Sequence, residues 1–390
     1  MPANQMGQAD DKYDGAMTPD ALLAARLANQ MLTGPDPGDP VAVVSRFGAV
    51  QAQEYGQSLW AIGLRLPDSD IGSIEAAIEA GAILRTWPMR GTIHLVPAAD
   101  ARWMVNLLAP RRVRQMASVY DRLGLTGAVF SRAGDIISAT LAGGKREQRK
   151  DLYAILTHHG IDCSASPNGS RGGHILGYLS MLGLICLGPL DGRQATFVLL
   201  DDWAPAGRTP AEPLAELARR YFTSHGPATA KDFSWWSGLT LREVGQAIEL
   251  AGPALEGVQV DEQQYWQGTK TTTPAGASPP PGAWLLPAFD EYTVAYRDRA
   301  ALLAGRKISP SELLNPVMVL DGLVVGVWRA TAGKAAVRIT LAPFHGVTAA
   351  DLDRFELPCA RYGSFTGLDV EVETGDYRQV RRIRAPDPAS

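Results

Sequence analysis

The feature that most constrains the fold is an order of elements near the N-terminus: helical segments followed by a pair of short strands. Apolar residues recur at helical spacing over residues 19–33, 40–47 and 71–80, and strand-like runs follow over 83–87 and 91–96. A Thr-Pro pair at the start of the first helix is an N-cap signal. Helices followed by a strand pair are the order of a winged helix, which predicts that fold for the first part of the chain.

The same order recurs twice, which predicts three tandem units. The elements expected in the later units are 149–158, 174–183, 184–187 and 195–200, then 213–225, 229–236, 241–250 and 255–265. Stacked units of this kind form a curved surface, which suits a long ligand such as a duplex.

The composition changes after the third unit. Residues 271–282 (TTTPAGASPPPG) contain almost no side chain able to pack, which predicts a linker or a surface insertion. Short runs rich in Val, Ile and aromatic residues follow and are typical of strands. We therefore predict an α+β chain with a disordered N-terminus (1–17), three winged-helix units (18–145, 146–205 and 206–270) and the Pro-rich segment (271–282). Residues 283–390 are predicted to form a C-terminal β-domain, either a small β-barrel-like domain or a sheet.

Cationic side chains are concentrated in one part of the chain. The whole chain has 37 Lys and Arg against 41 Asp and Glu, a net charge of -4, so it is not a polycation. Between residues 85 and 150, however, twelve cationic side chains face four acidic ones, a local charge of +8. Such clustering is typical of a nucleic-acid site.

The sequence lacks the motifs of several other classes of protein. Three widely spaced Cys without a CxxC pair argue against a disulfide framework and a structural zinc site, and favour a reducing cytoplasm. The apolar run 175–190 is interrupted by Gly and is shorter than the ~20 residues that a membrane span needs. P-loop, zinc-protease, serine-hydrolase and dinucleotide-binding motifs are absent from the sequence. We expect a cytoplasmic protein with no signal peptide, membrane partner, metal or cofactor.

Two polar segments of the first unit are candidates for a site. In an extended backbone residues i and i+2 point to the same side, so Gln51 and Gln53 would face one way together. By the same rule Arg90, Thr92 and His94 would share one polar, cationic face of a strand. The alternative is that the glutamines are ordinary surface residues and that the strand residues make structural hydrogen bonds or lie on a solvated face.

The best carboxylate pair in the chain is Asp290 and Glu291. Adjacent side chains diverge in direction, so catalysis by the pair is one interpretation and ion pairing to Arg297 or Arg299 is the simpler one. The two histidines at 158–159 favour a helix end over a metal site.

Four segments occur in a characteristic order: 51–53 (QAQ), 85–95 (RTWPMRGTIHL), 285–292 (LLPAFDEY) and 321–328 (DGLVVGVW). Together they resemble the winged-helix DNA glycosylases of the AlkZ/YcaQ family, from about Pro19 to Arg384. The resemblance implies three winged-helix units and a C-terminal β-domain in a C-shape around a basic DNA channel that contains the Gln-x-Gln segment.

The resemblance also implies an activity and a site. The activity is monofunctional excision of alkylated purines from double-stranded DNA, including bulky N7-guanine adducts and interstrand crosslinks, with Gln51 and Gln53 as the catalytic residues. One branch of the family has Gln-x-Asp. The second glutamine here favours the AlkZ-like branch, which is associated with self-resistance to genotoxic antibiotics.

The chemistry of glutamine agrees with a cationic substrate. A glutamine cannot accept a proton at neutral pH; it can orient water and present its carbonyl dipole to a developing oxocarbenium ion. No carboxylate is suitably placed beside the pair in the sequence, so the lesion has to supply the leaving-group charge, as an alkylated purine does. No Lys stands beside the pair either, so a Schiff-base lyase step is not expected.

Six residues are the candidates for DNA contacts. They are Arg90, Thr92 and His94 near the lesion, and Arg111, Arg112 and Arg114 on backbone phosphates. We expect the protein to act as a monomer. The competing hypothesis is a non-catalytic winged-helix DNA-binding protein or transcriptional regulator, because tandem winged helices alone do not distinguish the two.

Overall fold

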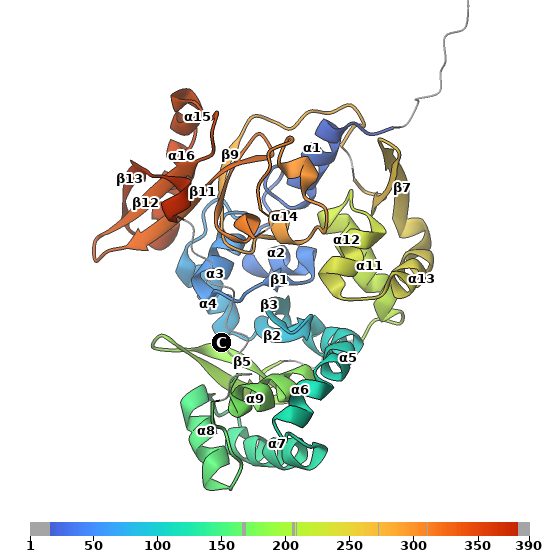
Figure 1. Cartoon of the computed structure of the whole chain (residues 1–390), viewed down its shortest axis with the longest axis vertical. Coiled ribbons are helices and arrows are strands. Elements are labelled where there is room, and N and C mark those ends of the chain that lie inside the picture. Colours follow the sequence, from blue (N-terminus) through green and yellow to red (C-terminus); the bar gives the residue numbers. More distant parts are fainter. Residues whose placement is uncertain are drawn as a thin grey trace, which may run out of the picture.

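The computed structural model describes residues 16–165, 169–204, 207, 209–271, 273–309 and 311–380. It is an α+β structure in which helices surround a central six-stranded sheet, and the C-terminal part forms a second sheet to one side (Figure 1). The expected disordered N-terminus falls mostly on residues 1–15, which lie outside the described residues. Met17 is buried, and its N–H donates to the Gln259 carbonyl at 2.8 Å. Within the described part, no helix is long and apolar enough to cross a membrane.

The first helices begin where their local sequence predicts. Thr18 and Asp39 each accept a hydrogen bond from a backbone N–H three residues later, and a proline occupies the first helical position after each cap. A short strand separates the second helix from the third, and a hairpin follows the fourth. The elements are α1 (Pro19–Asn29), α2 (Pro40–Phe47), β1 (Val50–Gln51), α3 (Tyr55–Gly63), α4 (Ile71–Glu79), β2 (Ile83–Met89) and β3 (Thr92–Pro97).

The central sheet joins two hairpins, and its strand order is β1-β3-β2-β5-β6-β4. Strands β2 and β5 meet where Arg85 lies opposite Leu187. Strand β1 lies at one edge, so one side of β1 has no strand partner among the described residues. The remaining elements of this region are β4 (Glu147–Gln148), β5 (Ile185–Asp191), β6 (Gln194–Leu199), α5 (Ala98–Gln115), α6 (Ala117–Arg122), α7 (Gly127–Leu141), α8 (Arg149–His158), α9 (Arg171–Met181) and α10 (Leu200–Trp203).

The third helical region packs against the first. Buried Arg26 of α1 donates to the Pro227 carbonyl at 3.0 Å, and the ring of His225 lies 5.4 Å from that of Phe47 at the end of α2. His225 is thereby held next to the element that leads into β1. The elements of this region are α11 (Pro213–His225), α12 (Ala230–Ser237), α13 (Leu241–Ala251), η1 (Gly252–Ala254), and the two-stranded sheet of β7 (Leu255–Val260) and β8 (Gln263–Gly268).

The C-terminal part is an open sheet, so the prediction of a barrel-like domain is wrong and the alternative of a sheet is confirmed. Its order is β13-β12-β11-β10-β9, which leaves β9 and β13 at opposite edges. Helix α16 covers the apolar face instead of a closing strand: the Tyr362 ring lies 5.1 Å from Trp328 of β11 and 5.0 Å from Trp60 of α3. The elements are β9 (Ala283–Leu286), α14 (Glu291–Val294), η2 (Ala300–Leu302), η3 (Glu312–Leu314), β10 (Val317–Leu320), β11 (Leu323–Ala332), β12 (Ala336–Pro343), α15 (Ala349–Asp353), α16 (Glu356–Thr366), β13 (Asp369–Thr374) and α17 (Tyr377–Val380).

Candidate active site

The Gln-x-Gln segment is extended at its first residue and bends after it. Gln51 lies in β1 opposite His94 of β3, and the N–H of Ala52 donates to the Ile93 carbonyl at 2.8 Å. The Gln51 side-chain Nε2 donates to Oε1 of Gln53 at 2.6 Å, so the two amides do lie on the same side of the backbone. Gln51 is only 7% exposed, whereas Gln53 is half-buried. Gln53 is therefore the member of the pair that is accessible from outside.

A buried arginine holds the bend, and sequence patterns mark it only as one cation of the basic segment. Arg85 of β2 donates to the Ala52 carbonyl from Nε at 3.0 Å and from Nη2 at 2.8 Å. Burial lowers the pKa of Arg85 to about 10, which leaves the guanidinium charged at neutral pH. The signal that could have identified it is an arginine in a strand whose other residues are almost all apolar.

The hairpin turn brings two of the three predicted strand-face residues to Gln51. Arg90 has a positive φ of 57°, and its Nη2 donates to Gln51 Oε1 at 3.2 Å. The same nitrogen lies 3.4 Å from Nε2 of His94, which is fully buried. The Thr92 hydroxyl instead donates to the Met89 carbonyl within the turn, at 3.4 Å. A direct duplex contact by any of these three side chains stays a prediction.

The surroundings of His94 fix its protonation state. Its Nδ1 lies 3.0 Å from the Thr92 carbonyl and donates to it, which leaves Nε2 as the acceptor that faces Arg90. Burial and the positive charge of Arg90 lower the pKa of His94 to about 3. His94 is therefore neutral at physiological pH and contributes no charge of its own to DNA binding.

This protonation state can be tested by NMR. The Cε1–H resonance of His94, assigned with a His94→Gln variant, is expected not to move between pH 7.5 and pH 5. In the unfolded chain this histidine is protonated below its ordinary pKa of 6.5, whereas in the folded protein it stays neutral down to about pH 3. His94 therefore costs the folded state about 1.4 kcal/mol per pH unit across this window as the pH falls. A titration midpoint near 6.5 would show that the imidazole is solvated.

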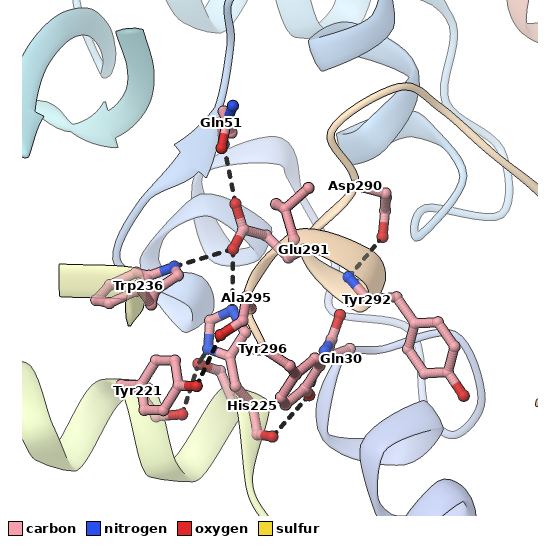
Figure 2. Close-up of polar contacts among 12 residues, drawn as sticks. Gln30, Gln51, Tyr221, His225, Trp236, Asp290, Glu291, Tyr292, Ala295 and Tyr296 are labelled. Atoms are coloured by element: carbon pink, nitrogen blue, oxygen red, sulfur yellow. Dashed lines mark hydrogen bonds and ion pairs between the residues drawn. The ribbon is translucent and has the colours of Figure 1, made fainter. Parts of the chain in front are cut away.

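A carboxylate lies directly behind Gln51, which corrects the expectation that none is near the pair. Glu291 of α14 is 2% exposed, and its Oε1 accepts the backbone N–H of Gln51 at 3.0 Å. Its Oε2 accepts the indole N–H of Trp236 at 3.0 Å and lies 3.3 Å from Nε2 of His225 (Figure 2). Burial by itself raises the pKa of the Glu291 carboxyl, but the hydrogen bond with His225 and the other interactions of the carboxylate, including the backbone N–H of Gln51, outweigh it and hold the pKa below its usual value.

The predicted ion pairs of the two carboxylates with Arg297 or Arg299 are also wrong. Asp290 instead makes a two-pronged pair with Arg65 of α3, at 2.8 and 2.9 Å, and caps α14 through the N–H of Tyr292. The two adjacent carboxylates diverge as expected, and each reaches a partner more than 60 positions away in the sequence. Hydrophobic spacing carries no signal for such long-range partners.

The partners of Glu291 are themselves held by a buried polar network. His225 stacks on Tyr221, with ring centroids 4.8 Å apart, and its Nδ1 lies 2.8 Å from the Ser224 hydroxyl. The Tyr296 hydroxyl donates to the His225 carbonyl at 2.7 Å and accepts from the Gln30 amide at 2.8 Å (Figure 2). Oε1 of Gln30 has no hydrogen-bond partner among the described residues. The other hydrogen bonds of this buried network hold its members in one arrangement.

The three predicted phosphate contacts of α5 have different surroundings. Arg111 is paired with Glu243 of α13 at 2.8 Å, whereas Arg114 is exposed. Arg112 lies against Gly91 of the hairpin turn and lines a pocket of about 120 Å³ that Trp87 also borders. Arg112 thus lies next to the turn that carries Arg90. In the described part of the chain, no group of three His, Cys, Asp or Glu side chains could hold a metal ion.

Comparison with known proteins identifies the family of this chain. Residues 44–365 match the family described as DNA glycosylase AlkZ-like. The chain is 26% identical over 324 residues to an interstrand DNA cross-link repair glycosylase of Streptomyces sahachiroi, an alignment that covers 79% of this chain and 86% of the relative. The solved structure of the Streptomyces sahachiroi DNA glycosylase AlkZ is similar, with a TM-score of 0.74 at 22% identity over 92% of this chain and all of the other. The match decides for an enzyme over a non-catalytic DNA-binding protein: this chain belongs to the AlkZ-like family of DNA glycosylases.

Proposed function

We propose that this protein is a monofunctional DNA glycosylase that acts as a monomer on double-stranded DNA and hydrolyses the N-glycosidic bond of cationic alkylated purines. The preferred lesions are bulky N7-guanine adducts, with interstrand crosslinks as further substrates. The biological role is self-resistance to a genotoxic natural product. The crosslink substrate is supported by the activity of the Streptomyces sahachiroi relative, an interstrand DNA cross-link repair glycosylase.

One observation carries the proposal: the amide of Gln53 is available for chemistry, and the nearby carboxylate is not. Gln51 uses its amide on Arg90 and Gln53, whereas Nε2 of Gln53 has no partner among the described residues. Glu291 is buried, and both of its oxygens are hydrogen-bonded, so it cannot take a proton from water. Water is then oriented by Gln53 and not deprotonated, which suffices only when the leaving base already carries a positive charge.

In this proposal the duplex lies in a basic channel next to the pair. The three helical regions with their hairpins act as winged-helix units, with boundaries near residues 145, 205 and 270, and border the channel in a C-shape together with the C-terminal sheet. Support comes from the local charge of +8 between residues 85 and 150 and from the similarity to a DNA glycosylase structure. Arg90 is the cation nearest to Gln51, and buried His94 acts on DNA only through it.

A strand-scission assay tests the proposal. A duplex with one N7-methylguanine, and a second with a bulky N7-guanine adduct, are incubated with the protein and then treated with alkali, which cleaves at abasic sites. Scission is expected at the adduct and only after the alkali step, because the enzyme releases the base without a lyase step. Scission no faster than in the protein-free control would refute the glycosylase proposal. Scission before alkali would refute its monofunctional part.

The different surroundings of the α5 arginines give a second test. Arg114→Ala is expected to weaken duplex binding and to reduce the slope of log affinity against log salt by about 0.9, the contribution of one neutralised phosphate. Arg111→Ala is the matched control and is expected to change the slope less, because Arg111 is already paired with Glu243. Fluorescence anisotropy over a range of salt concentrations measures both slopes. Equal slopes for the two variants would show that the ion pair opens when DNA binds.

A further inference from the structure

The backbone of the Gln-x-Gln segment is held from three directions. The N–H of Ala52 is bonded to β3, and the Ala52 carbonyl is bonded to Arg85. The N–H of Gln51 points to the open side of the edge strand β1, where the described part of the chain has no neighbouring strand to accept it. Glu291, 240 positions later, supplies that acceptor, so the C-terminal part of the chain completes the hydrogen bonding of the segment.

Glu291 also balances a positive charge. The positively charged guanidinium of Arg90 donates a hydrogen bond to the Gln51 side chain, whereas the neighbouring His94 is neutral. Burial lowers the pKa of Arg90, and the negative charge of Glu291 is the largest influence that opposes this shift. Base release builds positive charge on the sugar, which an uncompensated Arg90 would oppose in a site partly shielded from water.

We propose that Glu291 is a positioning residue for the glycosylase reaction: through the backbone N–H of Gln51 it fixes where the paired amides point, and its charge offsets that of Arg90. Trp236 and His225 hold its carboxylate in place. The inference rests on the proposed catalytic role of Gln51 and Gln53. It adds a residue of the C-terminal part to a site that is otherwise built from the first helical region and its hairpin.

The Glu291→Gln variant, which keeps the size of the side chain and removes its charge, tests the inference. The single-turnover rate of base release from an N7-methylguanine duplex is expected to fall about 10- to 100-fold, because small displacements of catalytic groups have effects of that size. Duplex affinity is expected to stay within about twofold, because Glu291 is buried. A rate within about twofold of wild type would overturn the inference.

A matched control separates positioning from general stability. Asp232 is a carboxylate of equal burial, 1% exposed, that accepts the N–H of Thr229 at 2.9 Å and of Arg297 at 2.9 Å and does not contact the Gln-x-Gln segment. Asp232→Asn is expected to lower the thermal unfolding temperature as Glu291→Gln does but to keep the wild-type rate at 25 °C. Equal rate losses in both variants would assign the effect of Glu291 to stability alone.

Non-additivity gives the sharpest readout. If Glu291 acts through the amides, then Glu291→Gln in a Gln53→Ala background is expected to slow the reaction by less than about threefold. A full additional loss would show that Glu291 does not act through the amides, which overturns its positioning role and leaves the proposed function standing. A wild-type rate in Gln53→Ala alone would instead refute the catalytic role of Gln53, on which the inference rests.

A milder variant covers the case in which Glu291→Gln does not fold. Trp236→Phe removes only the indole donor to Oε2 and keeps an aromatic ring in the core. A loss of about threefold in rate at unchanged duplex affinity is expected from it. An unchanged rate in a folded Trp236→Phe protein would contradict the positioning role.

Discussion

Replacing Gln53 with alanine is expected to slow base release about 100-fold or more while duplex affinity stays within about twofold. Gln53 stands at the accessible end of a hydrogen-bonded series that runs from Arg90 through Gln51. Its loss removes the group that orients water toward the sugar, and the removal of one such polar group typically costs about 10²–10³ in rate. Single-turnover kinetics on an N7-methylguanine duplex and anisotropy with the same duplex measure the two quantities.

The control for this experiment is another half-buried glutamine. Gln148 lies in β4, where its amide donates to Asp191 at 2.6 Å, and it has no contact with the Gln-x-Gln segment. Gln148→Ala is expected to keep the wild-type rate. If Gln53→Ala abolished duplex binding, the residue would be a DNA contact and its catalytic assignment would be wrong. If it left both rate and affinity unchanged, the amide pair would have no part in the reaction.

Sequence patterns predict the part of the site that is built by the neighbouring strands β1 and β3. Gln51 pairs with His94 across β1 and β3, 43 positions apart, and period-2 alternation places the polar side chains on a common face. Arg90 reaches Gln51 from the tight turn of the same hairpin. Glu291 lies 240 positions from Gln51 in the sequence, and no local periodicity predicts that its carboxylate accepts the backbone N–H of Gln51. The expectation that no carboxylate stands near the pair failed for that reason.

The same division holds for the fold. Helices α1 and α2 begin at their prolines because an N-cap and a proline are local signals. No helix is predicted over 98–115, where α5 continues through Pro110, a residue that usually ends a helix. Strand-like runs predict strands in the C-terminal part, but they do not encode whether a sheet closes on itself or is covered by a helix. Here α16, whose sequence includes Pro358, covers it.

The largest effect on stability is expected from the buried ion pair between Arg65 and Asp290. Their side chains are 1% and 0% exposed, so Asp290→Asn leaves a buried guanidinium without its counter-charge. Such a break costs about 3–5 kcal/mol, whereas the loss of an exposed pair costs about 0–1 kcal/mol. Glu371→Gln in the pair with Arg338, where the side chains are 58% and 59% exposed, is the matched control. Urea unfolding at pH 7 compares the midpoints.

A double variant separates the uncompensated charge from the loss of packing. Arg65→Met with Asp290→Asn removes both charges and keeps a side-chain oxygen that can accept the Tyr292 N–H at the start of α14. The double variant is expected to be more stable than Asp290→Asn alone, because no unpaired charge is left buried. A double variant no more stable than that single one would place the cost in packing. Since Glu291 follows Asp290 directly, Asp290→Asn is also expected to slow base release. A faster rate in the double variant than in that single one would show that the ion pair serves the site by holding α14 in place.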